Sequence, residues 1–293
     1  MKKKILIITG DNLGISNNQI DFEDIKFLKF PVIINDKEYR ESDEYTAQYL
    51  INRFKKEKVS AHSQALVKGD LVDIIQANKD KYDVIIHVLM GSNMSAATFQ
   101  MAELVRKEYE DIIPIINIDT KQVVSGVGSN ILRLIELLQT YDDMEEIRKK
   151  MAEIIKNTFT YLCLPDLNFL YRGGRIGRAK SLLGSVLKII PVVGLFGDEA
   201  DSGILPVGKG RTFSAVNKII IDNIKQKMQK NDVEKIKLIT ILDAEDNKSL
   251  SLKNLKEQIE DELQYEKIII GHLRFVEAIH VGPDAWLSTF ILK

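Results

Sequence analysis

Between residues 84 and 138 the chain twice repeats one order of elements: an apolar strand, a short polar turn and a helix. Residues 84–89 are predicted to form a buried strand, residues 90–93 a turn and residues 94–107 a helix. Residues 112–118 and 125–138 repeat the strand and the helix. Because strands joined through helices run parallel, the sequence predicts an α/β fold with a mostly parallel sheet in its N-terminal part.

The carboxyl ends of these strands carry small polar side chains. An earlier strand, predicted over residues 4–9, ends in the turn of Gly10, Asp11 and Asn12 and joins the same pattern. Ligands of open α/β sheets gather at this edge, so we expect a binding site there. Each Ser or Asp taken singly is also an ordinary helix cap.

The remaining elements predict a second α/β unit. We place a domain boundary at Leu164 and Pro165, which gives domains of residues 1–164 and 165–293. In the first domain, Asn35 and Asp36 predict a hairpin turn between a strand over residues 27–35 and a short strand. The predicted elements of the second domain are strands over 190–196, 203–207, 235–242 and 267–270, a helix opened by residues 208–212, and a helix over 250–263.

Residues 168–193 combine a cationic turn with an apolar segment. Gly173 and Gly174 have no Cβ, so the backbone can turn tightly there and approach a neighbour closely. The arginines beside this turn are Arg172, Arg175 and Arg178. The apolar residues that follow recur at helical spacing up to Pro191, and they include Leu183, Leu187 and Ile190. The stretch suits either a ligand with an anionic head and a hydrophobic body, or solvated arginines beside an ordinary core helix.

Charge and composition exclude several classes of partner. The 293 residues include 41 basic and 42 acidic side chains, and the net charge of −1 gives no general attraction to nucleic acid or to an anionic membrane. No apolar run is long enough for a membrane span, and the apolar part of residues 1–8 is too short for a signal peptide. The single cysteine, Cys163, excludes an internal disulfide and a multi-cysteine zinc site. We therefore expect a cytoplasmic protein.

The sequence lacks the common catalytic templates. There is no GxxxxGK[ST] phosphate loop. Gly126 and Gly128 form a GxG pattern without the third glycine of a dinucleotide site, and we interpret them as a packing feature. The histidines are scattered, so the fold would have to assemble any metal site. His62 and His280 lie in polar turns, whereas His87 lies inside a strand and is interpreted as structural.

Six segments together resemble the DegV family. They are Asp11-Asn12, His62-Ser63-Gln64, residues 91–96, Asp119-Thr120 followed by residues 125–128, residues 170–177 with the GGRIG motif, and His280-Val281-Gly282-Pro283. They occur in the family's order over nearly the whole chain, and GGRIG and His-x-Gly-Pro are the most specific. The resemblance implies a two-domain DegV-like fold: an N-terminal parallel-sheet α/β domain, a second α/β domain and a fatty acid between them.

The same resemblance implies a function. Family members, including the FakB-like proteins, bind a fatty acid and present its carboxylate to a separate ATP-dependent kinase (FakA-like), which makes an acyl phosphate for phospholipid synthesis. The residues expected to bind the ligand are His62, Ser63, Ser92, Asn93 and His280. Arg172 and Arg175 are expected to face the kinase or the transferred phosphate, so that Arg175→Ala would leave fatty-acid retention intact. The expected acyl pocket consists of Leu183, Leu187 and Ile190. The chain would be a ligand-binding subunit and not an enzyme, with no metal and no cofactor besides the fatty acid.

The sequence departs from the family pattern in ways that leave the ligand open. His62 stands where the family has threonine, Met90 where it has serine, and Asp284 where it has glycine. Two alternatives remain. One is a phosphotransferase related to the dihydroxyacetone-kinase-like proteins, which the missing phosphate loop disfavours. The other is a binder of a different small carboxylate or phosphorylated ligand.

Overall fold

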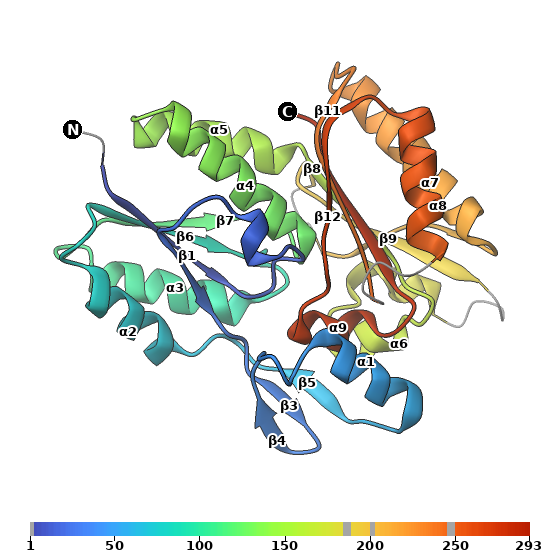
Figure 1. Cartoon of the computed structure of the whole chain (residues 1–293), viewed down its shortest axis with the longest axis horizontal. Coiled ribbons are helices and arrows are strands. Elements are labelled where there is room, and N and C mark those ends of the chain that lie inside the picture. Colours follow the sequence, from blue (N-terminus) through green and yellow to red (C-terminus); the bar gives the residue numbers. More distant parts are fainter. Residues whose placement is uncertain (1–2, 184–188, 200–202, 245–249) are drawn as a thin grey trace.

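The computed structural model describes residues 3–183, 189–199, 203–244 and 250–293, which form two large sheets with helices around and between them (Figure 1). The N-terminal sheet has the order β2-β1-β6-β7, and all its pairings are parallel. Its strands are β1 (Ile5–Gly10), β2 (Ile25–Leu28), β6 (Val84–Leu89) and β7 (Ile115–Asp119). Every residue of β6 is buried, as expected for a central parallel strand covered on both faces.

Helices cover both faces of this sheet. In Figure 1, α2 (Lys68–Asn78) and α3 (Ala96–Glu108) lie on one face. On the other face lie α4 (Ser125–Thr140) and α5 (Met144–Lys156). The parallel α/β architecture predicted from the strand, turn and helix repeat is thus confirmed.

The second sheet has six strands in the order β10-β9-β8-β13-β11-β12, and it is antiparallel except for the pair β11-β12. Its strands are β8 (Thr158–Cys163), β9 (Ile190–Phe196), β10 (Leu205–Gly210), β11 (Ile236–Asp243), β12 (Tyr265–Ile270) and β13 (Trp286–Ile291). The helices α7 (Phe213–Lys230) and α8 (Leu250–Glu262) cover its outer face (Figure 1).

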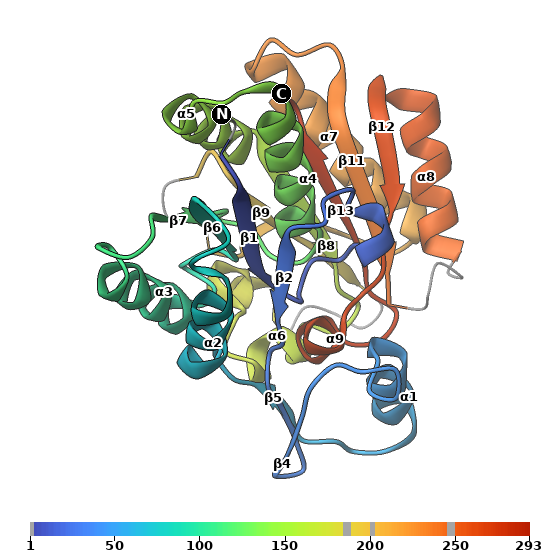
Figure 2. The same cartoon turned by 60° about the vertical axis from the view of Figure 1, so that its left-hand side comes forward.

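A third, small sheet lies below the two large ones (Figure 1 and Figure 2). It joins β4 (Lys37–Tyr39), β3 (Val32–Ile34) and β5 (Ala61–Ser63) in antiparallel pairs. The short helices α1 (Ala47–Lys56), α6 (Asn168–Arg172) and α9 (Phe275–Val281) lie nearby. The 3-10 helix Asn17–Gln19 instead bonds to Ile270 at the end of β12, and the 3-10 helix Gly177–Leu182 contacts β10. Figure 2 shows α9 beside α6 and above α1, and α9 packs against α1, α6 and β5. This small layer closes the lower ends of the two large sheets.

Helix α4 lies between the two large sheets and contacts both. Its first turns bond to the second sheet through hydroxyl pairs, Ser125 Oγ with Thr289 Oγ1 at 2.8 Å and Ser129 Oγ with Thr240 Oγ1 at 2.9 Å. A Cβ on Gly128 would overlap the carbonyl oxygen of Leu13. The interpretation of this GxG pattern as a packing feature is therefore confirmed.

Some sequence expectations need correction. The predicted strand over 27–35 is split, because β2 belongs to the parallel sheet and β3 to the small sheet. The helix expected up to Pro191 falls mostly on residues 184–188, Leu187 among them, which lie outside the described residues. Before them lies the 3-10 helix Gly177–Leu182, and after them Ile190 and Pro191 belong to β9 and not to a helix. The hairpin prediction is confirmed, since Asn35 and Asp36 both have positive φ between β3 and β4.

The domain boundary at residue 164 stays a prediction. Strand β8, which ends at Cys163, pairs with β13 and β9 and is therefore a central strand of the second sheet. A boundary placed after β8 separates this strand from its own sheet, whereas a boundary before Thr158 keeps the sheet whole. The pairings of β8 with β9 and β13 join residues that are far apart in the chain, so the sequence pattern did not reveal that β8 belongs to the second sheet.

Candidate ligand-binding site

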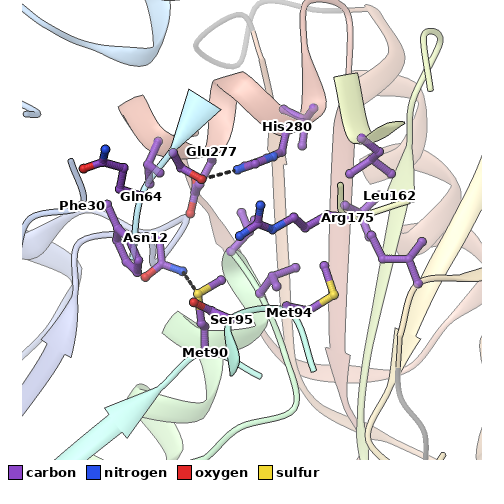
Figure 3. Close-up of a pocket in the computed structure, with 17 residues that line it drawn as sticks. Asn12, Phe30, Gln64, Met90, Met94, Ser95, Leu162, Arg175, Glu277 and His280 are labelled. Atoms are coloured by element: carbon purple, nitrogen blue, oxygen red, sulfur yellow. Dashed lines mark hydrogen bonds between the residues drawn. The ribbon is translucent and has the colours of Figure 1, made fainter. Parts of the chain in front are cut away.

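The described residues enclose a cavity of about 70 Å³ where the carboxyl ends of the N-terminal strands meet the small sheet, α9 and the second sheet. On the same scale a single water needs about 10–15 Å³. Most of the lining is apolar, and it includes Phe30, Met90, Met94, Val123, Val124 and Leu162. The polar lining residues are Asn12, Ser63, Gln64, Ser95, Arg175, Glu277 and His280 (Figure 3).

Ser63 and His280 form the central polar pair of the cavity. Side chains alternate along a strand, so Ser63 on β5 faces inward while its neighbour His62 is exposed on the opposite side. Ser63 Oγ lies 2.9 Å from His280 Nε2, although the two residues are 217 positions apart. Burial, together with the nearby Arg175 charge, lowers the pKa of His280 to about 4. The imidazole is therefore neutral at pH 7 and can take part in hydrogen bonds as one donor and one acceptor.

The GGRIG turn positions Arg175 against the cavity. Positive φ values at Gly174 (69°) and Gly177 (52°) let the chain fold back on α6, so that the backbone N–H of Arg175 donates to Leu170 O at 2.9 Å. The half-buried guanidinium donates from Nη1 to Gly173 O at 2.6 Å. Arg175 thus brings a permanent positive charge to the lining, whereas Arg172 is exposed and lies over the ring of Phe169.

Glu277 brings a carboxyl group into the same space from one turn earlier on α9. Its side chain is 4% exposed. Burial, with a smaller contribution from the Glu41 and Asp11 charges, raises the pKa of Glu277 to about 8. Glu277, His280 and Arg175 converge on one region in Figure 3.

The strand ends supply fewer ligand-facing groups than expected. Ser92, after β6, donates from Oγ to Asp119 Oδ2 at 2.6 Å, and its backbone N–H donates to Oδ1 of the same carboxylate. Neither Ser92 nor the exposed Asn93 is among the lining residues. The residue after β6 that does line the cavity is Met90, whose sulfur lies 3.9 Å from Asn12 Nδ2.

The structure brings together only part of the residue set expected from the sequence. Ser63, Arg175 and His280 line the cavity, whereas the other described candidates do not. Among the expected acyl-pocket residues, Leu183 packs at the edge of the apolar cluster beside the cavity. Ile190 packs on the opposite face of the second sheet. This separation follows from the alternation along β9, where Ile190 and Val192 face α7 and Val193 faces inward.

Sequence reasoning missed Asn12, Gln64, Ser95 and Glu277 as lining residues. A signal existed for Glu277, because it precedes His280 by three positions and the residues between are apolar, which is the spacing of one helical face. Reading residues 275–281 as a helix places both side chains on the same side. His280, which was expected in a polar turn, instead lies in the last turn of α9.

In the ranges that the structure describes, no group of three or more His, Cys, Asp or Glu side chains is arranged to hold a metal ion. The helices within these ranges are all too short or too polar to cross a membrane. Cys163 is free and buried in β8.

Comparison with known proteins agrees with this architecture. A DegV domain-containing protein of Listeria innocua is 25% identical over 296 residues and covers 100% of both chains. The structure of a DegV family protein from Thermus thermophilus, described by its fatty acid binding, has a TM-score of 0.89 at 20% identity, covering 99% of this chain and 100% of that one. A DegV family protein from Eubacterium eligens, solved with heptadecanoic acid, has a TM-score of 0.81 at 13% identity over 99% and 100%.

A family model also matches nearly the whole chain. The model of the DegV family matches residues 4–293. The described fold also has the two α/β parts that the resemblance implied, so the predicted fold class is confirmed. On this match the chain belongs to the DegV family.

Proposed function

We propose that this chain binds one long-chain fatty acid, with the carboxylate in the cavity near Ser63, Arg175 and His280 and the acyl chain extending along the apolar walls, which must open beyond the cavity of about 70 Å³ to take the whole chain. The observation that carries the proposal is the division of the lining, in which a few converging polar groups stand against a mostly apolar surface (Figure 3). A DegV family protein from Eubacterium eligens loaded with heptadecanoic acid and a stearic acid-binding protein from Eubacterium ventriosum, both similar to this chain in fold, support the same ligand class.

The proposed roles of the apolar walls and of the polar groups follow from the energetics of a fatty acid. Removing about 14 methylenes from water contributes roughly 11 kcal/mol, at about 0.8 kcal/mol each, before the entropy of ordering is subtracted. The apolar walls therefore supply the affinity. The polar groups must satisfy the carboxylate, because an unpaired buried charge is costly. A hydroxyl, a neutral imidazole and a guanidinium can together provide the donors that it needs.

We further propose that the bound carboxylate is presented to a separate FakA-like fatty acid kinase, so that the chain is a binding subunit for acyl-phosphate formation in phospholipid synthesis. The GGRIG resemblance and the absence of a phosphate loop from the sequence support this role. Arg172 and Arg178 are exposed beside the cavity-lining Arg175 and offer a cationic face to a partner. The reduced, buried Cys163 fits the cytoplasm as the place of action.

Mass spectrometry of an organic extract tests the ligand directly. The purified protein should carry a near-stoichiometric fatty acid of about 14–18 carbons. Burial of the acyl chain contributes enough free energy for the complex to survive purification. An unrelated protein purified in parallel is the control for carried-over lipid. An extract without fatty acid, after purification free of detergent, would contradict the proposal and favour the binder of another carboxylate.

Arg175→Ala should weaken fatty-acid binding about tenfold, because it removes the permanent charge that lines the cavity. This revises the expectation from the sequence, which assigned Arg175 to the kinase or to the transferred phosphate. The matched control is Arg172→Ala, whose exposed side chain is not part of the lining and whose loss should leave binding unchanged. Displacement of a fluorescent fatty acid measures both variants. Equal binding by Arg175→Ala and the unaltered chain would restore the earlier assignment.

A further inference from the structure

Among the described lining residues, Glu277 is the titratable group that the proposed head-group contacts leave unused. Its Oε2 accepts a hydrogen bond from the backbone N–H of Arg274 at 2.7 Å, which caps the first turn of α9. Its Oε1 is fully buried and has no hydrogen-bond partner among the described residues. A buried polar atom without a partner is costly, so its position at the cavity points to a partner that enters with a ligand.

The protonation state of Glu277 decides which ligand atom it can meet. Burial raises its pKa to about 8, so the carboxyl carries a proton at pH 7 and has an O–H to donate. Oε2 already accepts the capping N–H, which leaves Oε1 as the oxygen that faces the cavity. A protonated Oε1 would donate to an acceptor. An ionised Glu277 would instead place a second negative charge beside an anionic ligand.

We propose that Glu277 is a specificity-determining residue, which donates a hydrogen bond from its protonated carboxyl to the carboxylate of the bound ligand. The inference rests on the proposed function. A carboxylate offers only acceptors, and the lining provides one permanent positive charge, Arg175, among the described residues. A neutral Glu277 leaves that charge available to the ligand, so the pocket selects an anionic head. When Glu277 is ionised in the free protein, it must take up a proton as the ligand binds.

Other charged groups surround Glu277 and must be separated from its effect. Asp11, Glu41 and Arg274 contribute to its electrostatic environment, and Arg175 and His280 line the same cavity. Burial also raises the pKa of Asp11 to about 7, but Asp11 accepts from the backbone N–H of Phe30 and is not a lining residue. The other charged or titratable groups on elements packed against α9 are Tyr49, Arg53, Lys55 and Lys56 on α1, His62 on β5, and Tyr171 and Arg172 on α6.

The test is the pH dependence of binding, measured with the fluorescent fatty acid cis-parinaric acid between pH 6 and pH 9. A free fatty acid is ionised over this range, so a change in affinity reports on the protein. Below the pKa of about 8 the affinity should be constant. Above it each bound ligand must be accompanied by a proton, and binding should be about tenfold weaker at pH 9 than at pH 7.

Three variants identify the group that causes this pH dependence of binding. Glu277→Gln, whose amide donates without titrating and whose oxygen can still accept the Arg274 N–H, should remove the fall above pH 8. Glu277→Leu cannot donate and should weaken binding about tenfold at pH 7. Asp11→Asn removes the neighbouring titrating group outside the cavity and should keep the fall. Far-ultraviolet circular dichroism of each variant shows whether it is folded.

The outcomes separate this inference from the proposed function. If the unaltered chain binds cis-parinaric acid equally at pH 7 and pH 9, or if Glu277→Gln retains the fall, the role of Glu277 is overturned while fatty-acid binding stands. If Asp11→Asn alone removes the fall, the titrating group is Asp11 and the inference is again wrong. If no binding occurs at any pH, and the organic extract contains no fatty acid, the proposed function itself fails.

Discussion

Gly173→Ala should weaken fatty-acid binding at least about tenfold, although the added methyl group does not itself belong to the cavity lining. A Cβ at this position would overlap His280 Nδ1 and lie 2.9 Å from Cε1. The imidazole would have to move, and its 2.9 Å contact with Ser63 Oγ would break. Losing one buried hydrogen bond and the position of a second donor corresponds to more than a factor of ten in affinity. Titration with cis-parinaric acid at pH 7 measures this effect.

The matched control is the same chemical change at Gly69 in α2, where an added Cβ meets nothing within 4 Å. Gly69→Ala should bind the probe like the unaltered chain and should not lower its melting temperature, because alanine favours the helix. Thermal unfolding of both variants separates a displaced His280 from a general loss of structure. Normal binding by Gly173→Ala would show that the close approach of the GGRIG turn to His280 has no part in the site.

Trp286→Ala should lower the free energy of unfolding by about 3–5 kcal/mol, the largest effect on stability that we expect. Trp286 is fully buried in β13, where it pairs in register with Cys163 of β8 and Asp243 of β11. Its Nε1 donates to Asn217 Oδ1 of α7 at 3.0 Å, so truncation leaves both a void and an unpaired buried amide. Urea denaturation followed by circular dichroism measures the change, since the variant loses the single tryptophan of the chain.

Two variants calibrate that result. Trp286→Phe keeps most of the volume but removes the N–H donor, so its loss should be smaller, about 1–3 kcal/mol. Leu104→Ala truncates an apolar side chain that is 57% exposed on α3, and it should change stability by at most about 0.5 kcal/mol. A loss below about 1 kcal/mol for Trp286→Ala would mean that α7 and the second sheet close over the void.

Much of the first domain could be predicted because its signals are local. Residues 84–89 form an uninterrupted apolar run between polar turns, and β6 occupies that range. The hairpin at Asn35 and Asp36 also depends on neighbouring residues, since asparagine and aspartate tolerate positive φ. The placement of β8 could not be predicted in the same way. Its partners β9 and β13 lie about 30 and 130 positions further along the chain, and the sequence of a strand does not indicate which strands it will pair with.

The candidate site could likewise be predicted from the sequence only in part. The ordered motifs indicated the family and the general position of the site, and they included Ser63, Arg175 and His280. They did not distinguish Ser63 from Ser92, since both are hydroxyls in short polar segments. Only the folded chain shows that Ser63 faces His280 while Ser92 is bound to Asp119.

By itself the sequence determined the parallel α/β architecture and the polar turns around the site, because apolar periodicity and turn residues act over a few positions, and its ordered motifs resembled those of the DegV family. The tertiary structure alone decided which of those polar groups share a cavity and in which protonation state. Glu277 and His280 are ordinary titratable residues in the sequence. Burial by elements from distant parts of the chain makes both neutral at pH 7, since removing water penalises the charged form of each.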